Sequence, residues 1–462
     1  MNVVIVGQHA DVFRDLEPVM RELCRRGHQI VFLLGSRDGS EHLPGIAGVE
    51  IADRLVPDEP WPRRLRVGRQ VVSCGIYSRR DHPSPEGVAA TIERSLPDEV
   101  RAKLHTRRWR SIVASRAALH AWRWLEAASP ASAALTTMLE RIGPDVMLVS
   151  PPTSAAEPVQ ADYLRAARAL GVPAIACAHG WDDLTAHGTL HLFPDLYLAW
   201  NEPLAREAVD IHEVPAEAIR ITGAPHLDPL FSLRPLRTRA EVCAGMGRQD
   251  APYIVFLGSP RTIWDDESFL VRALADALAR ELGDRAPFVA VRPHPANREP
   301  LADCAHPGVV VLPGEATGPE GLQEHYDLLV RSACVFGLNT PAFLDAVVAD
   351  RPCLTIVGDM YWPAQGRTGH FRYLLAGGFL ETSRRMGDVA SRVRRILDGT
   401  DERAAARGEF ARSFLRPCGL DSAAGEIVAD LIESTARPRP GAAPVPGARR
   451  PLIPGLTLAK SL

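Results

Sequence analysis

The sequence predicts an α/β protein with two doubly wound parallel sheets. Short apolar strands alternate with helices in two blocks, residues 1–235 and 236–418, and polar residues follow directly after several of the strands. The first block opens with a strand at 3–6, an amphipathic helix at 12–26 and a second strand at 29–34. This strand–helix–strand order is typical of a doubly wound sheet, in which ligands bind at the carboxyl ends of the strands. We therefore expect two Rossmann-like domains.

Length and composition are consistent with two domains and additional segments. The chain has 462 residues and is 46% hydrophobic, which is enough for two packed cores. We expect an N-terminal domain at 1–235, a C-terminal domain at 236–418 and a helix at 419–436 that packs back on the first domain. The Pro/Gly-rich tail at 437–462 is expected to be disordered.

Charge and cysteine usage exclude several classes of protein. The net charge of −3 gives no reason to expect a polyanion such as nucleic acid as partner. The eight cysteines stand singly without a CxxC pair, which predicts reduced thiols and no zinc site. No apolar stretch reaches the roughly 18 residues of a spanning helix. We expect a cytoplasmic protein, at most peripheral at the inner face of a membrane.

Three strands of the second block each end in polar residues that suit a phosphate-bearing donor. Thr340 can cap a helix beginning at Pro341, whose free N–H groups would face a diphosphate, and Asn339 adds a side-chain donor. A plain capped helix, an ordinary turn and a structural histidine remain the alternatives. The full set of donor-binding candidates is Gly258, Ser259, Arg261, Arg292, His294, Asn339, Thr340 and Asp345.

The first block carries the candidates for acid–base chemistry. His9 and His179 each follow a predicted strand, and Asp182 is placed to orient a histidine or to act as the base itself. Trp181 is next to Asp182 and Asp183, and an aromatic face beside carboxylates suits a sugar ring. The Asp182-Asp183 pair does not stand at a strand end as a metal-binding DxD motif would, so we expect no metal site.

The segment 359–370 is expected to complete the substrate site. Gln365 and His370 offer an amide and an imidazole for recognition of a sugar or base, and the flanking glycines suit mobility. An ordinary surface loop is the alternative.

Several short segments, taken in order, resemble one family. They are 178–185, 200–202, 222–228, 292–295, 339–346 and 369–375. Their order is similar to that in GT-B-type glycosyltransferases of bacterial surface-polysaccharide biosynthesis, including a related branch that transfers glycerol phosphate from a cytidine nucleotide. The resemblance implies a GT-B-like fold, two Rossmann-like domains facing a cleft, with the nucleotide held mainly by the second domain and Asp345 on the ribose hydroxyls.

The resemblance implies a glycosyltransferase that uses a nucleotide sugar as substrate and needs no separate cofactor. We expect an inverting, metal-independent reaction with a surface glycan, a lipid-linked glycan or a glycosylated small molecule as acceptor. A CDP-polyol phosphotransferase and a non-catalytic nucleotide-sugar-binding protein are the alternatives. The acid and arginine pattern of nucleotide-sugar 2-epimerases is not visible.

A basic insert at about 57–129 interrupts the sheet pattern of the first domain. Residues 55–130 hold 14 Arg and Lys against 8 Asp and Glu, and they include Trp109, Trp122 and Trp124. The helical spacing of Trp109 and Trp122 is compatible with exposed faces. The insert is expected either to shape the acceptor site and rest on an anionic membrane, or to form a plain helical lid with core tryptophans.

Overall fold

The computed structural model describes most of the chain up to residue 437. The ranges outside the description are 41–42, 80–81, 83–87, 95, 105, 262, 303, 314–317, 367–368 and 438–462. The predicted tail therefore lies almost entirely outside the described residues.

The chain divides into two compact units. Unit 1 comprises Met1–His226 and Arg416–Leu462, and unit 2 comprises Leu227–Leu415. The division falls after His226, whereas the sequence pattern predicted it after residue 235. The chain thus returns to unit 1 for its last helix.

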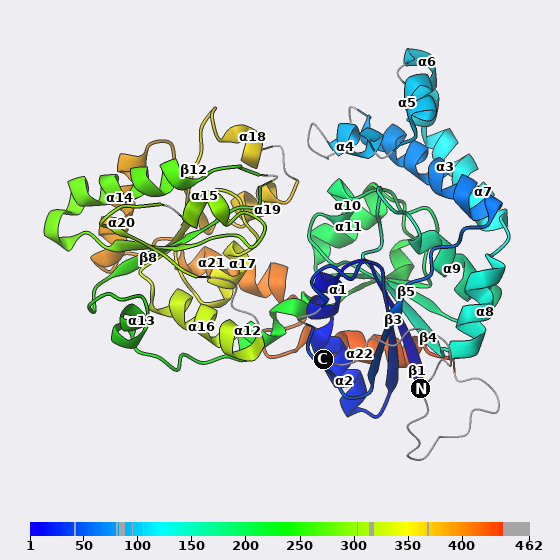
Figure 1. Cartoon of the computed structure of the whole chain (residues 1–462), viewed down its shortest axis with the longest axis horizontal. Helices are drawn as coiled ribbons and strands as arrows, with labels where there is room; N and C mark the ends of the chain where they lie inside the picture. Colours follow the sequence, from blue (N-terminus) through cyan, green and yellow to red (C-terminus); the bar gives the residue numbers. More distant parts are fainter. Residues whose placement is uncertain are drawn as a thin grey trace. The chain divides into compact units, whose positions relative to one another are not determined.

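Unit 1 is built on a seven-stranded, fully parallel sheet (Figure 1). The strand order is β3-β2-β1-β4-β5-β6-β7, so the direction of winding reverses between β1 and β4. The buried apolar runs that predicted these strands form both faces of the sheet. The strands are β1 (Asn2–Gly7), β2 (Gln29–Leu34), β3 (Val49–Asp53), β4 (Val146–Ser150), β5 (Ala174–Cys177), β6 (Leu196–Ala199) and β7 (Ile219–Ile221).

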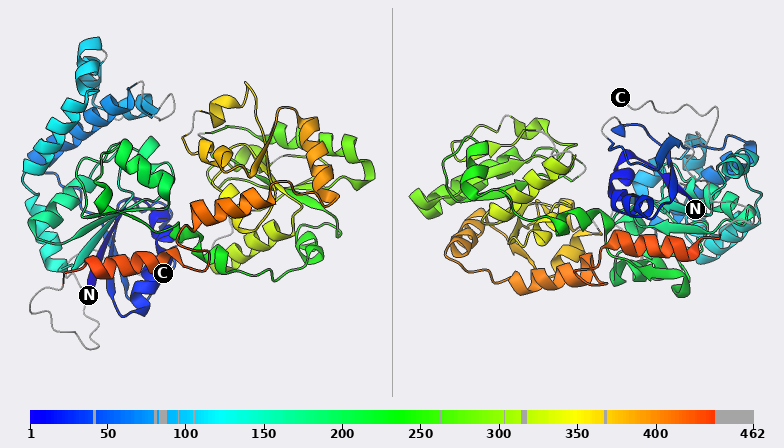
Figure 2. Two further views of the ribbon diagram at one scale, coloured as in Figure 1. Left: turned by 180° about the vertical axis from the view of Figure 1, so that it is seen from behind. Right: turned by 90° about the horizontal axis from the view of Figure 1, so that it is seen from below.

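Helices cover both faces of this sheet (Figure 2). The helix predicted at 12–26 is two helices, because the backbone leaves helical geometry at Leu16. The helices of unit 1 outside the insert are α1 (Ala10–Asp15), α2 (Glu17–Arg25), α8 (Ala133–Ile142), α9 (Gln160–Ala169), α10 (Asp183–Ala186), α11 (Glu202–Asp210) and α22 (Ala424–Thr435).

The last helix, α22, packs against α2, in the place expected for the 419–436 helix. Val428 and Ile432 are fully buried in the core beneath β1 and β2. Arg26 pairs with both Asp430 and Glu433 at 2.6 Å, which fixes the helix at its outer edge.

The insert is helical throughout most of its described part. Its helices are α3 (Pro60–Tyr77), α4 (Val88–Arg94), α5 (Asp98–Leu104), α6 (Arg107–Val113) and α7 (Arg116–Ala128). A buried ion cluster joins it to α9: Arg69 of α3 donates to Glu126 of α7 and to Asp162 of α9, each at 2.7 Å, and Arg165 pairs with both carboxylates. Two cations thus balance two anions away from water, so removal of any one would leave a buried charge unpaired.

Unit 2 is a second, six-stranded parallel sheet. Its order is β10-β9-β8-β11-β12-β13, which places a reversal of winding between β8 and β11. The strands are β8 (Tyr253–Leu257), β9 (Phe288–Arg292), β10 (Val309–Val311), β11 (Val335–Gly337), β12 (Cys353–Ile356) and β13 (Leu380–Ser383).

The helices of unit 2 enclose a core centred on β8 and β11. They are α12 (Asp228–Ser232), α13 (Arg239–Gly245), α14 (Ser268–Leu282), α15 (Glu299–Ala302), α16 (Gly318–Arg331), α17 (Phe343–Val348), α18 (Trp362–Gln365), α19 (Phe371–Ala376), α20 (Met386–Leu397) and α21 (Ala404–Phe410). Within the described residues, we find no helix with the length and apolar character needed to cross a membrane.

Candidate functional site

In unit 1, the loops that follow β1 and β4 meet where the winding of the sheet reverses. Gln8 directly follows β1, and its amide donates to the hydroxyl of Ser154, beyond β4, at 2.9 Å. His9 is the next residue and precedes α1. Reversal points of this kind are where open parallel sheets bind ligands. His9 is therefore placed at the expected edge.

His179 follows β5 and is held by two carboxylates. Its ring Nδ1 lies 3.0 Å from the Asp15 carboxylate of α1, and its backbone N–H donates to Asp183 at 2.6 Å. The same Asp183 oxygen accepts from the Gly180 N–H at 3.1 Å. Orientation of the ring by Asp15 was not anticipated, because α1 and β5 lie far apart in the sequence.

The two histidines have pKa values displaced in opposite directions. Partial burial, together with the charges of Arg54 and His179, lowers the pKa of His9. Burial also acts to lower the pKa of His179, but its close ion pair with Asp15 outweighs this effect and raises the pKa to about 9. At neutral pH, His9 is a free base and His179 is an imidazolium.

Arg54 is a charged neighbour of His9 that the sequence pattern did not reveal. It follows β3, is buried, and pairs with the partly exposed Glu157. A Cβ at Gly35 would lie 2.6 Å from the guanidinium carbon, so only glycine leaves room for Arg54 at this position.

Asp182, Asp183 and His187 form a group that was not anticipated from the sequence. Each offers one ligand atom, and these atoms lie within 4.8 Å of one another. His187 lies 3.5 Å from Asp182, and this carboxylate overcomes the effect of burial and raises the pKa of His187 to about 9. The group has the ligand types of a divalent-cation site, and it is the strongest challenge to the expectation of no metal.

Trp181 is placed differently from the expectation. Its side chain is only 5% exposed, so the ring is packed inside the protein and does not offer an open face to a sugar.

In unit 2, the loops after β8 and β9 touch each other. A Cβ at Gly258 would lie 2.8 Å from the backbone nitrogen of His294, and the Gly258 N–H donates to the Arg292 carbonyl at 2.9 Å. Gly258 is thus required for close approach between two loops near the reversal point. His294 accepts a hydrogen bond from the Ala296 N–H on its own Nδ1, and Arg261 is exposed beside Glu299.

Ser259 is fully buried, and its N–H, carbonyl and hydroxyl are all hydrogen-bonded. Its N–H donates to Glu267 at 2.7 Å, its carbonyl accepts from Asn297 at 3.2 Å, and its hydroxyl accepts from the Asn339 N–H at 3.4 Å. Its hydroxyl is therefore engaged within the protein, and Ser259 supports the loop instead of presenting a free donor. Burial raises the pKa of Glu267 to about 7, and the nearby Asp266 adds to the rise.

Asn339 and Thr340 are also buried, and the local helix differs from the expectation. The Asn339 amide nitrogen donates to the Ala364 carbonyl at 2.8 Å, and its oxygen lies 3.1 Å from His370 Nε2. The helix α17 begins at Phe343 without a side-chain cap, although the Thr340 hydroxyl accepts from the Ala342 N–H at 3.4 Å. The helix therefore begins two residues later than predicted, and the Thr340 hydroxyl bonds an N–H of the turn that precedes it.

Asp345 has a positioning partner that the sequence pattern did not reveal. His325 of α16 is buried, and its Nε2 lies 3.0 Å from an Asp345 oxygen. Burial and the charge of Arg292 lower the pKa of His325, so the neutral ring donates its Nε2–H to the carboxylate. Arg292, His325 and Asp345 thus form one electrostatic group at the carboxyl end of the sheet.

Gln365 belongs to the framework of the 359–370 loop. It is fully buried, and its amide nitrogen donates to the carbonyls of Leu338 and Ile356 at 3.0 and 2.9 Å. Gln365 therefore ties α18 to the ends of β11 and β12, whereas His370 is half-buried beside Asn339.

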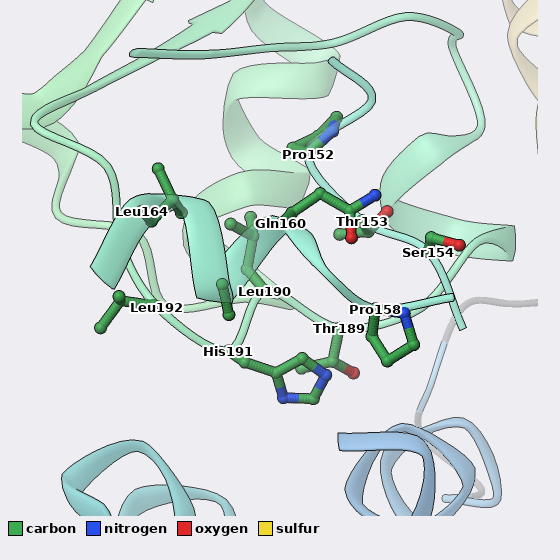
Figure 3. A pocket seen from close by; sticks show the side chains of 11 residues that line it. Pro152, Thr153, Ser154, Pro158, Gln160, Leu164, Thr189, Leu190, His191 and Leu192 are labelled. Atoms are coloured by element: carbon green, nitrogen blue, oxygen red, sulfur yellow. The ribbon is translucent and has the colours of Figure 1, made fainter. Parts of the chain in front are cut away.

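A small hollow lies in unit 1 (Figure 3). It contains none of the predicted site residues. Burial holds the pKa of His191 well below its usual value, so this ring is neutral. The hollow is lined by Pro152, Thr153, Ser154, Pro158, Gln160, Ala161, Leu164, Thr189, Leu190, His191 and Leu192.

Comparisons with known proteins identify the fold. No family model matches the chain, and no curated protein matches its sequence. The UDP-GlcNAc 2-epimerase of Methanocaldococcus jannaschii matches with 11% identity and a TM-score of 0.52, over 94% of this chain and 100% of that one. The Neisseria meningitidis enzyme of the same name matches with 15% identity, a TM-score of 0.52 and the same coverage. A glycosyltransferase from Rickettsia africae matches with 10% identity and a TM-score of 0.52, over 94% and 98%.

These neighbours confirm the predicted fold class: two Rossmann-like parallel-sheet domains of the GT-B type. At these identities the likeness extends to the fold alone.

Proposed function

We propose that the protein is a glycosyltransferase that transfers a sugar from a nucleotide-sugar donor to a hydroxyl acceptor, with inversion and without an obligatory metal. The support for the donor class is the fold that it shares with two epimerase structures solved with UDP-GlcNAc bound. The nucleotide sugar is a substrate, so the proposal requires no separate cofactor.

The observation that carries the proposal is the opposite displacement of the His9 and His179 pKa values. Removal of an acceptor proton needs a group that is unprotonated at working pH, and two titratable groups with separated pKa values can take opposite roles. His9 meets the requirement for the base, because its pKa is lowered. His179 does not, because Asp15 raises its pKa to about 9. His179 instead supplies a fixed positive charge.

Unit 2 is proposed to hold the donor. Arg292 supplies a positive charge for the diphosphate, and Asp345 accepts hydrogen bonds from ribose hydroxyls while His325 fixes its orientation. Gly258 and His294 line the same strand ends, and Ser259, Asn339 and Gln365 hold the loops behind them. Charge that develops on the leaving nucleotide is then stabilised by Arg292 and backbone N–H groups.

The acceptor is proposed to be a glycan, a lipid-linked glycan or a glycosylated small molecule, bound by unit 1. The half-buried Asp182, beside His187, provides a carboxylate for sugar hydroxyls, whereas Asp183 is buried and holds the His179 backbone.

A nucleotide panel tests the proposal. Thermal unfolding is measured with UDP, GDP, CDP and their sugars, because a ligand that binds only the native state raises the melting temperature. We expect a shift with one nucleoside diphosphate and its sugars, followed by sugar transfer with inverted anomeric configuration by NMR. Turnover of CDP-glycerol would replace the proposal by the polyol-phosphate alternative, and interconversion of the donor at C2 without an acceptor would make the protein an epimerase. Binding without any turnover would leave a nucleotide-sugar-binding protein.

A further inference from the structure

The outer end of the insert forms a distinct surface of unit 1. Helices α5 and α6 project away from the sheet beyond α3 in Figure 1 and in the left view of Figure 2. They contact each other, and α6 also contacts α3 and α7. This end of the insert therefore presents much of its surface to solvent.

Two large apolar side chains of α6 are exposed at this end. Trp109 is 52% exposed and Ile112 is 46% exposed. They are three residues apart on one helix, so they are neighbours on its surface. This exposed aromatic and aliphatic pair is a candidate contact surface.

Positive charge surrounds this pair. Residues 98–116 hold six Arg and Lys against two acids, Asp98 and Glu99. The basic side chains in the described part that are exposed are Lys103, Arg108, Arg110 and Arg116. Arg110 lies 3.3 Å from Glu93, so it is partly neutralised. The surface thus combines an aromatic ring, an aliphatic side chain and an excess of cations.

The helix that carries the pair is fixed to the body of the insert. A Cβ at Gly75 would lie 2.4 Å from the Val113 carbonyl oxygen, so α3 and α6 are in backbone contact. Ser115 accepts from the Ala118 N–H at 3.1 Å and donates to the Ile112 carbonyl at 2.7 Å, which locks the turn between α6 and α7. Trp109 and Ile112 are therefore presented without a conformational change.

We propose that this end of the insert, centred on Trp109 and Ile112 of α6, docks on an anionic lipid surface. A tryptophan ring has an apolar body and a polar N–H and favours the headgroup region of a bilayer. Neighbouring Lys and Arg side chains are attracted to anionic headgroups, and each charge raises the affinity about fivefold. An acidic protein surface would match the charges, but it gives no comparable reason for the exposed ring and aliphatic pair. The inference does not depend on which reaction the protein performs.

Vesicle co-sedimentation of the full chain tests the inference. We expect binding to phosphatidylcholine vesicles that contain phosphatidylglycerol, weaker binding to phosphatidylcholine alone, and loss of binding at high salt. The double variant W109A/I112A and the charge-reversal variant R108E/R116E should each lower the bound fraction at least about fivefold. The control is Trp124→Ala, which removes a more exposed tryptophan, 73% exposed, from α7.

Three results would overturn the inference. Equal recovery of the native protein in the supernatant with and without anionic vesicles excludes docking. Loss of binding in R108E/R116E with full binding of W109A/I112A reduces the surface to an electrostatic patch, as an acidic protein partner would use. An equal loss of vesicle binding in Trp124→Ala would show that the lipid contact is not centred on α6. Unchanged melting temperatures identify variants that remain folded, and a vesicle-induced blue shift of fluorescence that Trp109→Phe abolishes gives a second measure of insertion.

Discussion

The two units use the same sheet geometry for different electrostatic tasks. In unit 1, the loops at the reversal of winding carry ionisable side chains, and Asp15 holds His179 protonated while His9 stays neutral. In unit 2, some of the predicted polar residues hold other loops: Ser259 and Asn339 are buried and engaged. The proposed function accordingly assigns proton transfer to unit 1 and nucleotide binding to unit 2.

The largest expected effect comes from removal of His9. His9→Ala should lower kcat by about 10²–10⁴-fold, the usual contribution of a general base, with little change in nucleotide affinity. The activity of the native protein should fall only below about pH 6.5, the ordinary pKa of histidine, because the His9 pKa is lowered from that value. Steady-state kinetics over a pH series measure both effects. His120→Ala, at an exposed histidine of α7, serves as control. An unchanged kcat in His9→Ala would contradict the assignment of the base to unit 1.

Glu267 makes the stability of unit 2 depend on pH. Burial raises its pKa from the ordinary value of 4.5 to about 7 in the folded protein. Folding therefore binds a proton between these values, and stability falls as pH rises through that window. Glu267→Gln should remove this slope, which amounts to about 3 kcal/mol by pH 7. Urea unfolding at several pH values measures it. The exposed Glu299→Gln should leave the slope intact, and a slope that persists in Glu267→Gln would contradict the assignment.

Replacement of Asn339 and Thr340 tests whether the buried hydrogen bonds of unit 2 are needed for nucleotide binding. Replacing both by Ala should weaken nucleotide binding by about 1–3 kcal/mol, the range for buried hydrogen-bonding groups left without a partner. Because Asn339 bridges Ala364 and His370, part of this loss is expected through displacement of the 359–370 loop. Calorimetric titration with the nucleotide found in the panel measures the change, with the exposed Thr400→Ala as reference. Unchanged affinity would exclude this site.

The smallest expected effect is that of metal removal. Treatment with a chelator should leave turnover close to that of the untreated protein, since the proposed reaction uses Arg292 and backbone groups for charge stabilisation. Assays with EDTA, with and without added Mg²⁺, measure this. Complete loss of activity that Mg²⁺ restores would instead assign Asp182, Asp183 and His187 as a metal site.

Much of the fold could be predicted from local sequence patterns. The strand at 29–34 was predicted with the bounds that it has in the structure, because a short apolar run bounded by polar residues is a local signal. The break at Leu16 and the start of α17 at Phe343 were missed, because capping and helix breaks depend on backbone geometry that neighbours impose. The structure also decides between the two positions that were open for Trp122: a Cβ at Gly68 would lie 2.0 Å from its ring, so this tryptophan packs on α3 and is not exposed like Trp109.

The sequence by itself determined two parallel sheets and the strand ends at which polar residues gather, since both follow from the spacing of residues along the chain. Only the tertiary structure decided which of those residues are available and which are charged. His179 is held protonated by Asp15, Asp345 is oriented by His325, and Ser259 is enclosed by Glu267. The physical reason is that the pKa and the hydrogen bonds of a side chain depend on burial and on partners that folding brings from distant segments.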